Sequence, residues 1–514
     1  MKKLLLYFML AASFMACEQT TQTIEGDFTA AILPQPKSIS SVKQGLVLSE
    51  SSKIYTANEK LGDLADLFQT DLHKLTGHKM ERAISADQDA DIVFAIDASM
   101  PEDEYQLKVD SKIELKGGSY QAVAMGKNSL LQLVQTKGDE LIFPVLAISD
   151  SPDATYRGLM IDLARKWHDV NSIKELIDLA AFYKLNYVQL HFTDYQSYTL
   201  PSTKYPKLST PDRHYSFEDL KDLEAYAQVR GISIIPEIDI PGHSSPFVKM
   251  YPKIFAIQDT ASNPWIINMG KEEVYTALDT IIGEIAAIFQ ASPYFHIGGD
   301  EAIFNQVDQD PAVQTYMAKH DLGTDVHELY RHFLVRMNEI VKSHQKQMCV
   351  WEGFRKEGTV EIPKDIIVFE FETNRYLPDM LVKDGYTVVN TSWKPLYVVN
   401  QKKWEPKTIY AWNMWRWENW WPNAPSFEPI QLEKSSQIIG AQMCAWEQAQ
   451  VVELPSLRKR VPVFLERIWN TEEKISYEEL MSRMNETDKR LSLLIGNDAQ
   501  DSLLLDHNFI KPEE

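Results

Sequence analysis

Two adjacent carboxylates, Asp300 and Glu301, follow an apolar run and two glycines in the segment "HIGGDEAIF". Neighbouring carboxylates repel each other, and the repulsion costs stability unless the pair performs a task. Taken alone, the segment also fits a strand that ends in a turn with solvated acidic residues. The choice between a chemical and a structural role therefore depends on what the rest of the chain brings to the same place.

Other apolar runs also end in, or are followed by, polar or aromatic residues that could do chemistry. These residues are Arg165, Asp194, Asp239, His243, Trp351, Tyr397 and Trp446. The sequence contains no His-Glu-x-x-His motif, no cysteine cluster, no Gly-x-Ser-x-Gly and no phosphate-binding loop, which disfavours metal hydrolysis and acyl transfer. Carboxylates among tryptophans instead suit a sugar, because indole faces pack on pyranose rings and carboxylates and arginine bind hydroxyls.

The elements that must position these residues follow a regular pattern. After a Pro-containing joint near residue 151, eight apolar, β-branched runs alternate with stretches of helical periodicity: "YRGLMIDL", "NYVQLHFTD", "ISIIPEID", "YFHIGGD", "QMCVWEG", "DIIVFEFE", "YTVVNTS" and "IIGAQMCAW". The pattern predicts an α/β fold, a (β/α)8 TIM barrel, over residues 151–514 with a C-terminal helical extension. Active sites in such barrels lie at the carboxyl ends of the strands, so all these residues are expected at the same end of the barrel.

Residues 31–150 are predicted to form a separate small α+β domain. "KIYTA", "DIVFAID", "EYQLKVD" and "KIELKG" have strand patterns, and "LGDLADLFQTDLHKLTG" and "SYQAVAMGKNSLLQLVQ" have helical spacing. No chemistry-bearing residue stands out in this domain.

The first 17 residues, "MKKLLLYFMLAASFMAC", are typical of a bacterial lipoprotein signal that ends at Cys17. Residues 18–30 would then form a polar tether, and the protein would be exported and anchored in the cell envelope only through a lipid on Cys17. An ordinary cleaved signal with an incidental cysteine is the alternative. Periplasmic and surface locations both stay open. The other two cysteines, Cys349 and Cys444, lie in apolar runs and are predicted to be buried core thiols.

The charge balance of the chain restricts its partners. Lys plus Arg number 52 and Asp plus Glu number 73, for a formal net charge of -21. This balance argues against a nucleic-acid partner, because polyanion binding needs a basic face. No cofactor or metal site is predicted, and the oligomeric state is left open.

Four segments carry a resemblance to a known family. "RGLMIDLAR", "YKLNYVQLHFTD", "PEIDIPGH" and "HIGGDE", in this order, resemble the family 20 glycoside hydrolases, the β-N-acetylhexosaminidases, and "ILPQPKSI" resembles the opening of their small N-terminal domain. The resemblance covers about residues 30–470. It implies retaining hydrolysis in which the acetamido oxygen of the substrate attacks the anomeric carbon.

The resemblance also implies roles for individual residues. Glu301 would be the general acid/base, and Asp300 would hold the acetamide N–H and, when ionised, help to keep Glu301 protonated. Tyr397 would donate to the acetamide oxygen, and Arg165 would bind sugar hydroxyls. The remaining assignments are a wall of the sugar pocket for Trp351 and Trp446, and a support of Glu301 for Asp194, His243 and Asp239.

The chain departs from the family pattern at several positions. Tyr195 in "TDYQSY" replaces an Asp, Phe371 replaces a pocket Trp, and Val399 and Gln448 replace two acids that bind sugar hydroxyls. Neutral residues at the last two positions, with Arg416 in the Trp-rich loop as a ligand for an oxyanion, predict a terminal GlcNAc with an anionic group such as 6-sulfate. Unsubstituted GlcNAc or GalNAc is the alternative sugar, and a non-catalytic glycan-binding lipoprotein is the alternative function.

Overall fold

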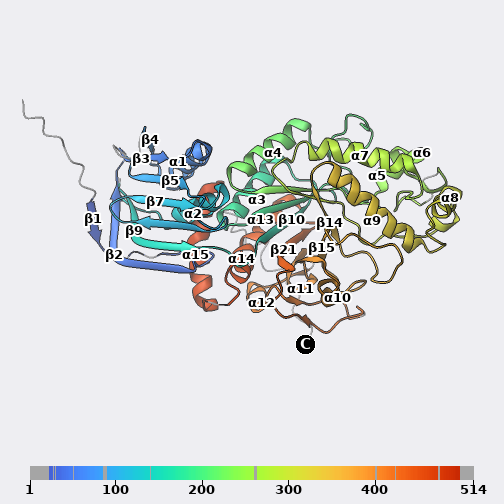
Figure 1. Cartoon of the computed structure of the whole chain (residues 1–514). Coiled ribbons are helices and arrows are strands. Elements are labelled where there is room, and N and C mark those ends of the chain that lie inside the picture. Colours follow the sequence, from blue (N-terminus) through green and yellow to red (C-terminus); the bar gives the residue numbers. More distant parts are fainter. Residues whose placement is uncertain are drawn as a thin grey trace, which may run out of the picture.

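The computed structural model describes residues 22–497, except 27, 29, 50, 85–89, 139, 260–262, 400–401, 423 and 473–474. The chain forms a sheet-and-helix domain followed by a barrel (Figure 1). The predicted signal segment, Cys17 and residues 18–21 of the predicted tether lie outside the described residues. Among the helices of the described part, none has both the length and the apolar character needed to cross a bilayer.

The N-terminal domain is a nine-stranded sheet with two helices of its own. Its strand order is β1-β2-β9-β6-β7-β5-β3-β4, with β8 beside β9. The bounds are β1 Gln22–Glu25, β2 Ser38–Leu48, β3 Lys53–Thr56, α1 Gly62–Thr76, β4 Glu81–Arg82, β5 Ile92–Ile96, β6 Tyr105–Val109, β7 Ile113–Gly117, α2 Tyr120–Leu133, β8 Gln135–Lys137 and β9 Glu140–Asp150. Gly77 ends α1 with a φ of 78° and donates its N–H to the His73 carbonyl oxygen.

The eight predicted apolar runs form eight parallel strands that close into a barrel. In order around the barrel they are β10 Tyr156–Asp162, β11 Tyr187–His191, β12 Ser233–Glu237, β13 Tyr294–His296, β14 Gln347–Trp351, β15 Ile367–Glu370, β16 Thr387–Asn390 and β21 Ile438–Trp446. The pairing of β10 with β21 closes the ring. The predicted TIM-barrel fold is therefore confirmed.

Helices surround this barrel (Figure 1). The main ones are α3 Val170–Phe182, α4 Phe217–Val229, α7 Glu272–Ala286, α9 Val326–Ser343, α13 Gln450–Arg458 and α14 Val461–Trp469, and shorter ones lie in the loops: α5 Ser245–Met250, α6 Pro252–Phe255, α8 Pro311–Lys319, α10 Pro378–Lys383, α11 Trp393–Leu396 and α12 Pro406–Ala411. Asp169 and Ser216 cap the N-termini of α3 and α4 through their side chains. The final helix, α15 Tyr477–Ile495, returns to contact α1 of the N-terminal domain.

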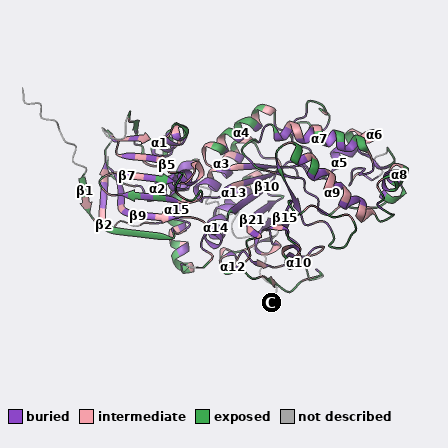
Figure 2. Cartoon of the chain, viewed as in Figure 1, coloured by how far each residue is buried: buried purple, intermediate pink, exposed green. Residues whose placement is uncertain are grey.

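The barrel strands are buried along most of their length (Figure 2) because their apolar residues face either the helices or the barrel interior. The interior is filled by a cluster that includes Tyr156, Met160, Phe369, Cys349 and Cys444. Both cysteines are buried and unbridged, which confirms the prediction of core thiols.

Candidate active site

Five predicted site residues line one pocket at the carboxyl ends of the barrel strands. The pocket has a volume of about 230 Å³, and these five residues are Arg165, Asp300, Glu301, Tyr397 and Trp446. Tyr397 reaches the pocket because it begins β17, Tyr397–Val399, which pairs in parallel with the end of β21. The other lining residues are Phe371, Trp393, Val399, Trp420 and Glu447. The pocket is thus aromatic on several sides and carries three carboxylates and one guanidinium.

The two glycines before Asp300 have a clear structural reason. Gly298 and Gly299 have φ values of 67° and 100°, in the left-handed region that glycine tolerates. A Cβ at Gly298 would collide with the carboxylate of Asp239, whose Oδ1 accepts a hydrogen bond from Gly299 N at 3.1 Å. Asp239 therefore supports the turn that presents the two carboxylates. Glu301 itself has a φ of 45°, a strained conformation of a kind that concentrates at functional sites.

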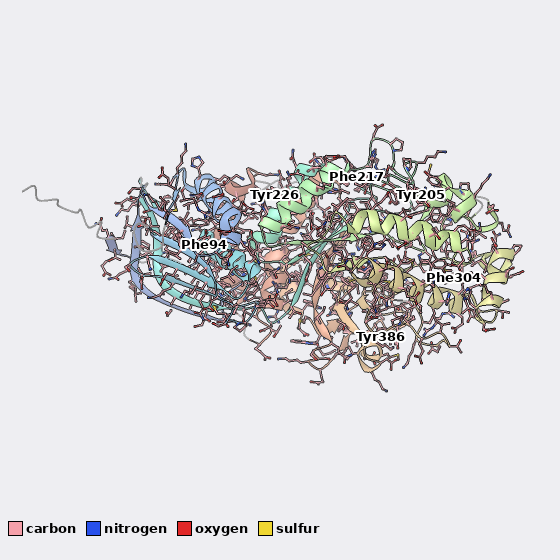
Figure 3. All side chains as sticks on the ribbon, turned by 45° about the horizontal axis from the view of Figure 1, so that its top comes forward. Phe94, Tyr205, Phe217, Tyr226, Phe304 and Tyr386 are labelled. Atoms are coloured by element: carbon pink, nitrogen blue, oxygen red, sulfur yellow. The ribbon has the colours of Figure 1, made fainter. Side chains whose placement is uncertain are left out.

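The segment after Glu301 is anchored to the outer ring of helices. The ring of Phe304, labelled in Figure 3, lies 5.1 Å from the ring of His327 and 5.6 Å from the ring of Tyr330, both on α9. Tyr330 also donates its hydroxyl to the carbonyl oxygen of Gly299. The turn that carries the carboxylates is therefore held from both ends.

A chain of polar side chains leads from Glu301 into the barrel. His243 Nε2 lies 3.5 Å from Glu301 Oε2, and His243 Nδ1 lies 3.3 Å from Asp194 Oδ2. Asp194 Oδ2 lies 3.1 Å from Nε2 of the buried His191, whose Nδ1 is 2.9 Å from Glu237 Oε2. The structure thus brings Asp194 and His243 together behind Glu301 in the arrangement that the sequence predicts.

These contacts shift the pKa values of the two carboxyls in opposite directions. The hydrogen bond from His243 lowers the pKa of Glu301, whereas burial, followed by repulsion from Glu301, raises the pKa of Asp300. Burial lowers the pKa of His243, but Asp239, Asp194, Glu301 and Asp300 outweigh burial and hold it well above 6.5. In the free protein the proton therefore lies on His243 rather than on Glu301. Asp300 was expected to help to keep Glu301 protonated, but in the free protein the contact with His243 outweighs that effect and Glu301 is ionised.

Arg165 is fixed at the pocket by three carboxylates. Its guanidinium lies 3.2 Å from Asp162 Oδ2, 2.7 Å from Asp194 Oδ2 and 3.8 Å from Glu447 Oε1. It also lies 5.0 Å from the ring centroid of Trp446. Burial lowers the pKa of Arg165, but the attraction of Asp162 and Asp194 is larger and raises the pKa above its usual value, so the group stays charged. A fixed cation beside an indole is suited to binding sugar hydroxyls.

Three buried polar atoms of the pocket-lining residues have no hydrogen-bond partner among the described residues. They are Oδ1 of Asp300, which is 9% exposed, and Nε1 of Trp393 and of Trp446. A buried polar atom without a hydrogen bond costs about 1–3 kcal/mol, so a ligand that supplies the missing donor and acceptor gains affinity. Burial also raises the pKa of Tyr397, which keeps its hydroxyl a neutral donor. The pocket therefore presents both an acceptor and donors to a ligand.

Trp351 does not line the pocket. It ends β14 with its side chain in the barrel interior, 1% exposed, and its Nε1 donates to Glu237 Oε1 at 2.6 Å. Its ring lies 5.8 Å from Trp446 and 6.0 Å from Phe371, so it lies against these pocket-lining rings. Since strand side chains alternate in direction, a residue at a strand end can point into the core as readily as toward the mouth.

Gln448 is also absent from the pocket lining. It is fully buried, and its Nε2 donates to the Trp446 carbonyl oxygen at 3.0 Å. Its neighbour Glu447 lines the pocket instead, because a φ of 57° and a hydrogen bond from its N–H to Asp162 Oδ2 at 3.2 Å turn the backbone there. The expectation of a neutral residue at this wall is therefore wrong, since the pocket carries a carboxylate there.

Arg416 lies outside the pocket. It pairs in a short strand, β19 Arg416–Trp417, with β20 Ile430–Gln431, where Trp417 is fully buried and Arg416 therefore faces the other side. Its Nε lies 2.5 Å from Glu418 Oε1. An ion pair with its own neighbour leaves Arg416 unsuited to the predicted role of binding an oxyanion on the sugar.

The side chains of the site that were not predicted include the charged or polar residues His191, Glu237 and Glu447 and the lining tryptophans Trp393 and Trp420. His191 and Glu237 end β11 and β12, and a polar residue inside an apolar strand is the signal that could have found them. Within the described part of the chain, two groups have atoms within 4.8 Å of one another and could hold a metal ion: His191, Asp194 and Asp239, and Asp239, His243 and Asp300. His191 and His243 already contact Asp194, and Asp239 already supports the turn before Asp300, so we assign these groups to the polar chain and to that turn.

Comparison with known proteins gives the same picture. Residues 155–472 match the family model "Glycosyl hydrolase family 20, catalytic domain", and residues 29–151 match "Glycosyl hydrolase family 20, domain 2". A β-hexosaminidase of Vibrio furnissii is 30% identical over 373 residues, which are 67% of this chain and 60% of that protein. A β-hexosaminidase of Porphyromonas gingivalis is 27% identical over 379 residues, 67% of this chain and 48% of that protein. The chain thus spans about half to three-fifths of these relatives.

Solved structures share the fold. The GH20 exo β-N-acetylglucosaminidase of Vibrio harveyi, in complex with N-acetylglucosamine, has a TM-score of 0.78 and 24% identity, and the match covers 92% of this chain and 79% of that one. A β-N-acetylhexosaminidase of Bacteroides fragilis has a TM-score of 0.77 and 22% identity over 90% of this chain and 96% of that one. Since the catalytic-domain match alone runs from residue 155 to residue 472 of 514, this chain belongs to glycosyl hydrolase family 20.

Proposed function

We propose that this protein is an exo-acting β-N-acetylhexosaminidase that removes terminal β-linked GlcNAc-type sugars. The observation that carries the proposal is the single pocket that joins Asp300, Glu301 and Tyr397. A non-catalytic glycan-binding protein would not need a strained Glu301 tied to a proton-holding histidine. The name of the Vibrio harveyi enzyme, and the N-acetylglucosamine bound to it, agree with this choice of sugar.

In the first step, the carbonyl oxygen of the substrate's 2-acetamido group attacks the anomeric carbon. The glycosidic bond breaks, and Glu301 gives its proton to the departing oxygen. Asp300 accepts the acetamide N–H with its unpartnered Oδ1 and stabilises the positive charge that develops on the oxazolinium ring. Tyr397 donates its hydroxyl to the acetamide oxygen and so orients it.

In the second step, Glu301 removes a proton from a water that attacks the anomeric carbon. The bond to the acetamide oxygen breaks, and two inversions at the same carbon leave the sugar with its original configuration. Glu301 thereby regains the proton that it gave to the leaving group, and it can pass this proton back to His243, which lies 3.5 Å away and holds it in the free protein. The remainder of the polar chain holds His243 in place.

The exo mode of action follows from the pocket. Its volume of about 230 Å³ is below the roughly 300–1,000 Å³ of typical ligand sites, so we expect it to hold one sugar ring. Trp446 offers a ring face, while Arg165 and Glu447 offer a donor and an acceptor for ring hydroxyls. These groups suit the non-reducing end of a glycan.

For the sugar itself we propose unsubstituted GlcNAc, with 6-sulfated GlcNAc as the second candidate. Val399 on the lining and the free Trp393 N–H favour the sulfated sugar. The Glu447 carboxylate opposes it, since a like charge about 4 Å away costs on the order of 4 kcal/mol at an effective dielectric near 20. The ratio of kcat/KM for aryl 6-sulfo-β-GlcNAc and aryl β-GlcNAc decides between them, and a preference for the sulfated glycoside would reverse our assignment.

The test of the activity is the release of nitrophenol from its β-GlcNAc glycoside by the wild type and by Glu301→Gln. We expect turnover by the wild type with retention at the anomeric carbon, and a large loss in the variant. No turnover of any β-linked acetamido sugar by the wild type would leave the glycan-binding function as the better account.

We also infer that the protein is exported and anchored through a lipid on Cys17. The support is the sequence alone: two lysines, a short apolar stretch and a small residue before the cysteine. Incorporation of labelled fatty acid into the wild type, and its loss in Cys17→Ser, tests this inference. Absence of label from the wild type would favour an ordinary cleaved signal.

A further inference from the structure

Two exposed aromatic rings stack on each other just outside the sugar pocket. Tyr195 and Trp265 have ring centroids 4.4 Å apart and an interplanar angle of 15°, and they are 37% and 42% exposed. Neither ring lines the pocket that contains Asp300 and Glu301. The catalytic steps described above therefore leave this pair without a role.

The contacts of the stack cover Tyr195 on both faces of its ring. The ammonium of Lys249 lies 4.6 Å from the centroid of the Tyr195 ring. A stacked indole covers one whole face of that ring, so Lys249 must lie over the other face. Tyr195 is thus enclosed between a cation and an indole, while Trp265, stacked on one side only by Tyr195, keeps 42% of its surface exposed to solvent.

Hydrogen bonds fix the Trp265 loop to both segments that carry the acid machinery. Ser245, two residues after His243, donates its hydroxyl to the carbonyl oxygen of Pro264 at 2.7 Å. Asn263 donates its side-chain amide to the carbonyl oxygen of Asn305, four residues after Glu301, at 2.8 Å. The Trp265 loop is therefore bonded to the segments that follow His243 and Glu301.

Tyr195 is tied to the same machinery through the backbone. It follows Asp194 directly, and Asp194 contacts His243, which contacts Glu301. The aromatic pair thus lies on the side of the pocket from which Glu301 and its polar chain approach. A general acid protonates the oxygen of the departing group, so the group that leaves must also lie on the Glu301 side.

We propose that Trp265, braced by Tyr195 and Lys249, is the platform for the leaving-group sugar, the first residue on the reducing side of the cleaved bond. The inference rests on the proposed hydrolase function and names the class of its aglycone. A pyranose of gluco configuration has equatorial substituents and axial C–H bonds, so it presents an apolar face to an indole. The protein would therefore favour glycans whose second residue is such a sugar over glycosides with small leaving groups.

The kinetic test compares two substrates that differ only beyond the scissile bond. One is β-GlcNAc linked to a second GlcNAc, and the other is β-GlcNAc fluoride, whose leaving group has no ring. We expect Trp265→Ala to lower the ratio of kcat/KM for the disaccharide to that for the fluoride by about tenfold, and Trp265→Phe by less, because a smaller ring remains. Trp421→Ala removes an indole of similar exposure, 43%, and should leave the ratio unchanged.

An unchanged ratio in Trp265→Ala would overturn the proposal. An equal loss with both substrates would also overturn it, because it would indicate a structural role for the indole. Turnover of neither substrate by the wild type would count against the proposed hydrolase function alone.

A binding measurement tests the Trp265 platform independently of the proposed hydrolase function. In a Glu301→Gln background, calorimetry gives the Kd of the intact disaccharide and of free GlcNAc. We expect Trp265→Ala to weaken disaccharide binding by about tenfold and to change GlcNAc binding little. Equal affinities of the disaccharide with and without the indole would rule out the platform whether or not the wild type is an enzyme.

Discussion

At the level of single residues, the position of one proton governs the chemistry. The free protein keeps this proton on His243, because four carboxylates face that imidazole, while Glu301 is held ionised by the same contact. The acid step needs the proton on Glu301. In the proposed mechanism, substrate binding removes water from Glu301 and weakens its ionised form, so we expect the two residues to function as one acid with a shared proton.

Replacement of His243 by Asn tests this shared proton. The alkaline limb of kcat/KM reports loss of the proton from the free Glu301–His243 pair, and the pKa of His243 lies well above 6.5. Asparagine cannot hold the proton, so the limb is then set by the Glu301 carboxyl, which titrates at lower pH. We expect the alkaline limb of His243→Asn to move to lower pH, and the exposed His214→Asn to keep the wild-type profile. A limb that stays in place would show that the histidine does not share the proton.

The neutral variants Asp300→Asn and Glu301→Gln should lose activity on different sets of substrates. Glu301→Gln loses the acid, so substrates with poor leaving groups should suffer most, whereas Asp300→Asn should slow all substrates because Asp300 acts on the acetamide. Either change should raise the barrier by about 2–4 kcal/mol, the cost of one preorganised contact. For each variant, a series of aryl β-GlcNAc glycosides gives the slope of log kcat/KM against the pKa of the leaving group. Equal slopes for the two variants would contradict these roles.

At the level of elements, the turn after β13 is the most constrained part of the site. Gly298 needs a positive φ and has no room for a Cβ beside Asp239, whereas Gly77 needs a positive φ but has open space around it. Gly77→Ala should therefore cost about 1–2 kcal/mol of folding stability, the backbone cost alone. Gly298→Ala should cost roughly 1–3 kcal/mol more from the collision and should also reduce activity. Chemical denaturation measures the free energy of unfolding of both variants. Equal decreases would mean that the Asp239 carboxylate moves aside for the added Cβ at little cost.

The same scale shows what the sequence can and cannot predict. The apolar runs and their order predict the barrel and place the site at the carboxyl ends of its strands. The structure accordingly brings together Asp300, Glu301, Tyr397 and Arg165. The direction of a side chain at a strand end was not predictable, and Trp351 points into the core. The positive φ at Glu447 has no sequence signal, so the pocket received Glu447 instead of Gln448. The prediction that Arg416 lies at the sugar pocket is wrong, because a strand of two residues has no recognisable sequence pattern.

At the level of the whole molecule, a buried ionic cluster joins the two domains. Asp150 of β9 accepts hydrogen bonds from Trp469 Nε1 at 2.9 Å and Tyr105 Oη at 2.7 Å, and lies 3.7 Å from Lys184 Nζ. Lys184 is fully enclosed, and burial lowers its pKa to about 8. The charges compensate each other across the boundary between the small domain and the barrel.

Asp150→Asn should destabilise the protein by about 3–5 kcal/mol, because it leaves Lys184 buried without its counter-charge. Asp66→Asn removes an exposed partner of Arg82 and should cost less than about 1 kcal/mol. Calorimetric unfolding of both variants gives the comparison. A small effect at Asp150 would mean that water reaches the cluster or that Lys184 gives up its proton at little cost.

The return of α15 to the N-terminal domain has a consequence for synthesis. The chain emerges from the ribosome from its N-terminus, so α1, which ends at Thr76, is complete about 400 residues before α15, which begins at Tyr477. At roughly 5–20 residues per second, the surface of α1 that α15 covers stays open for about 20–80 s. The small domain thus cannot reach its final packing as a nascent unit, because a helix translated about 400 residues later completes it.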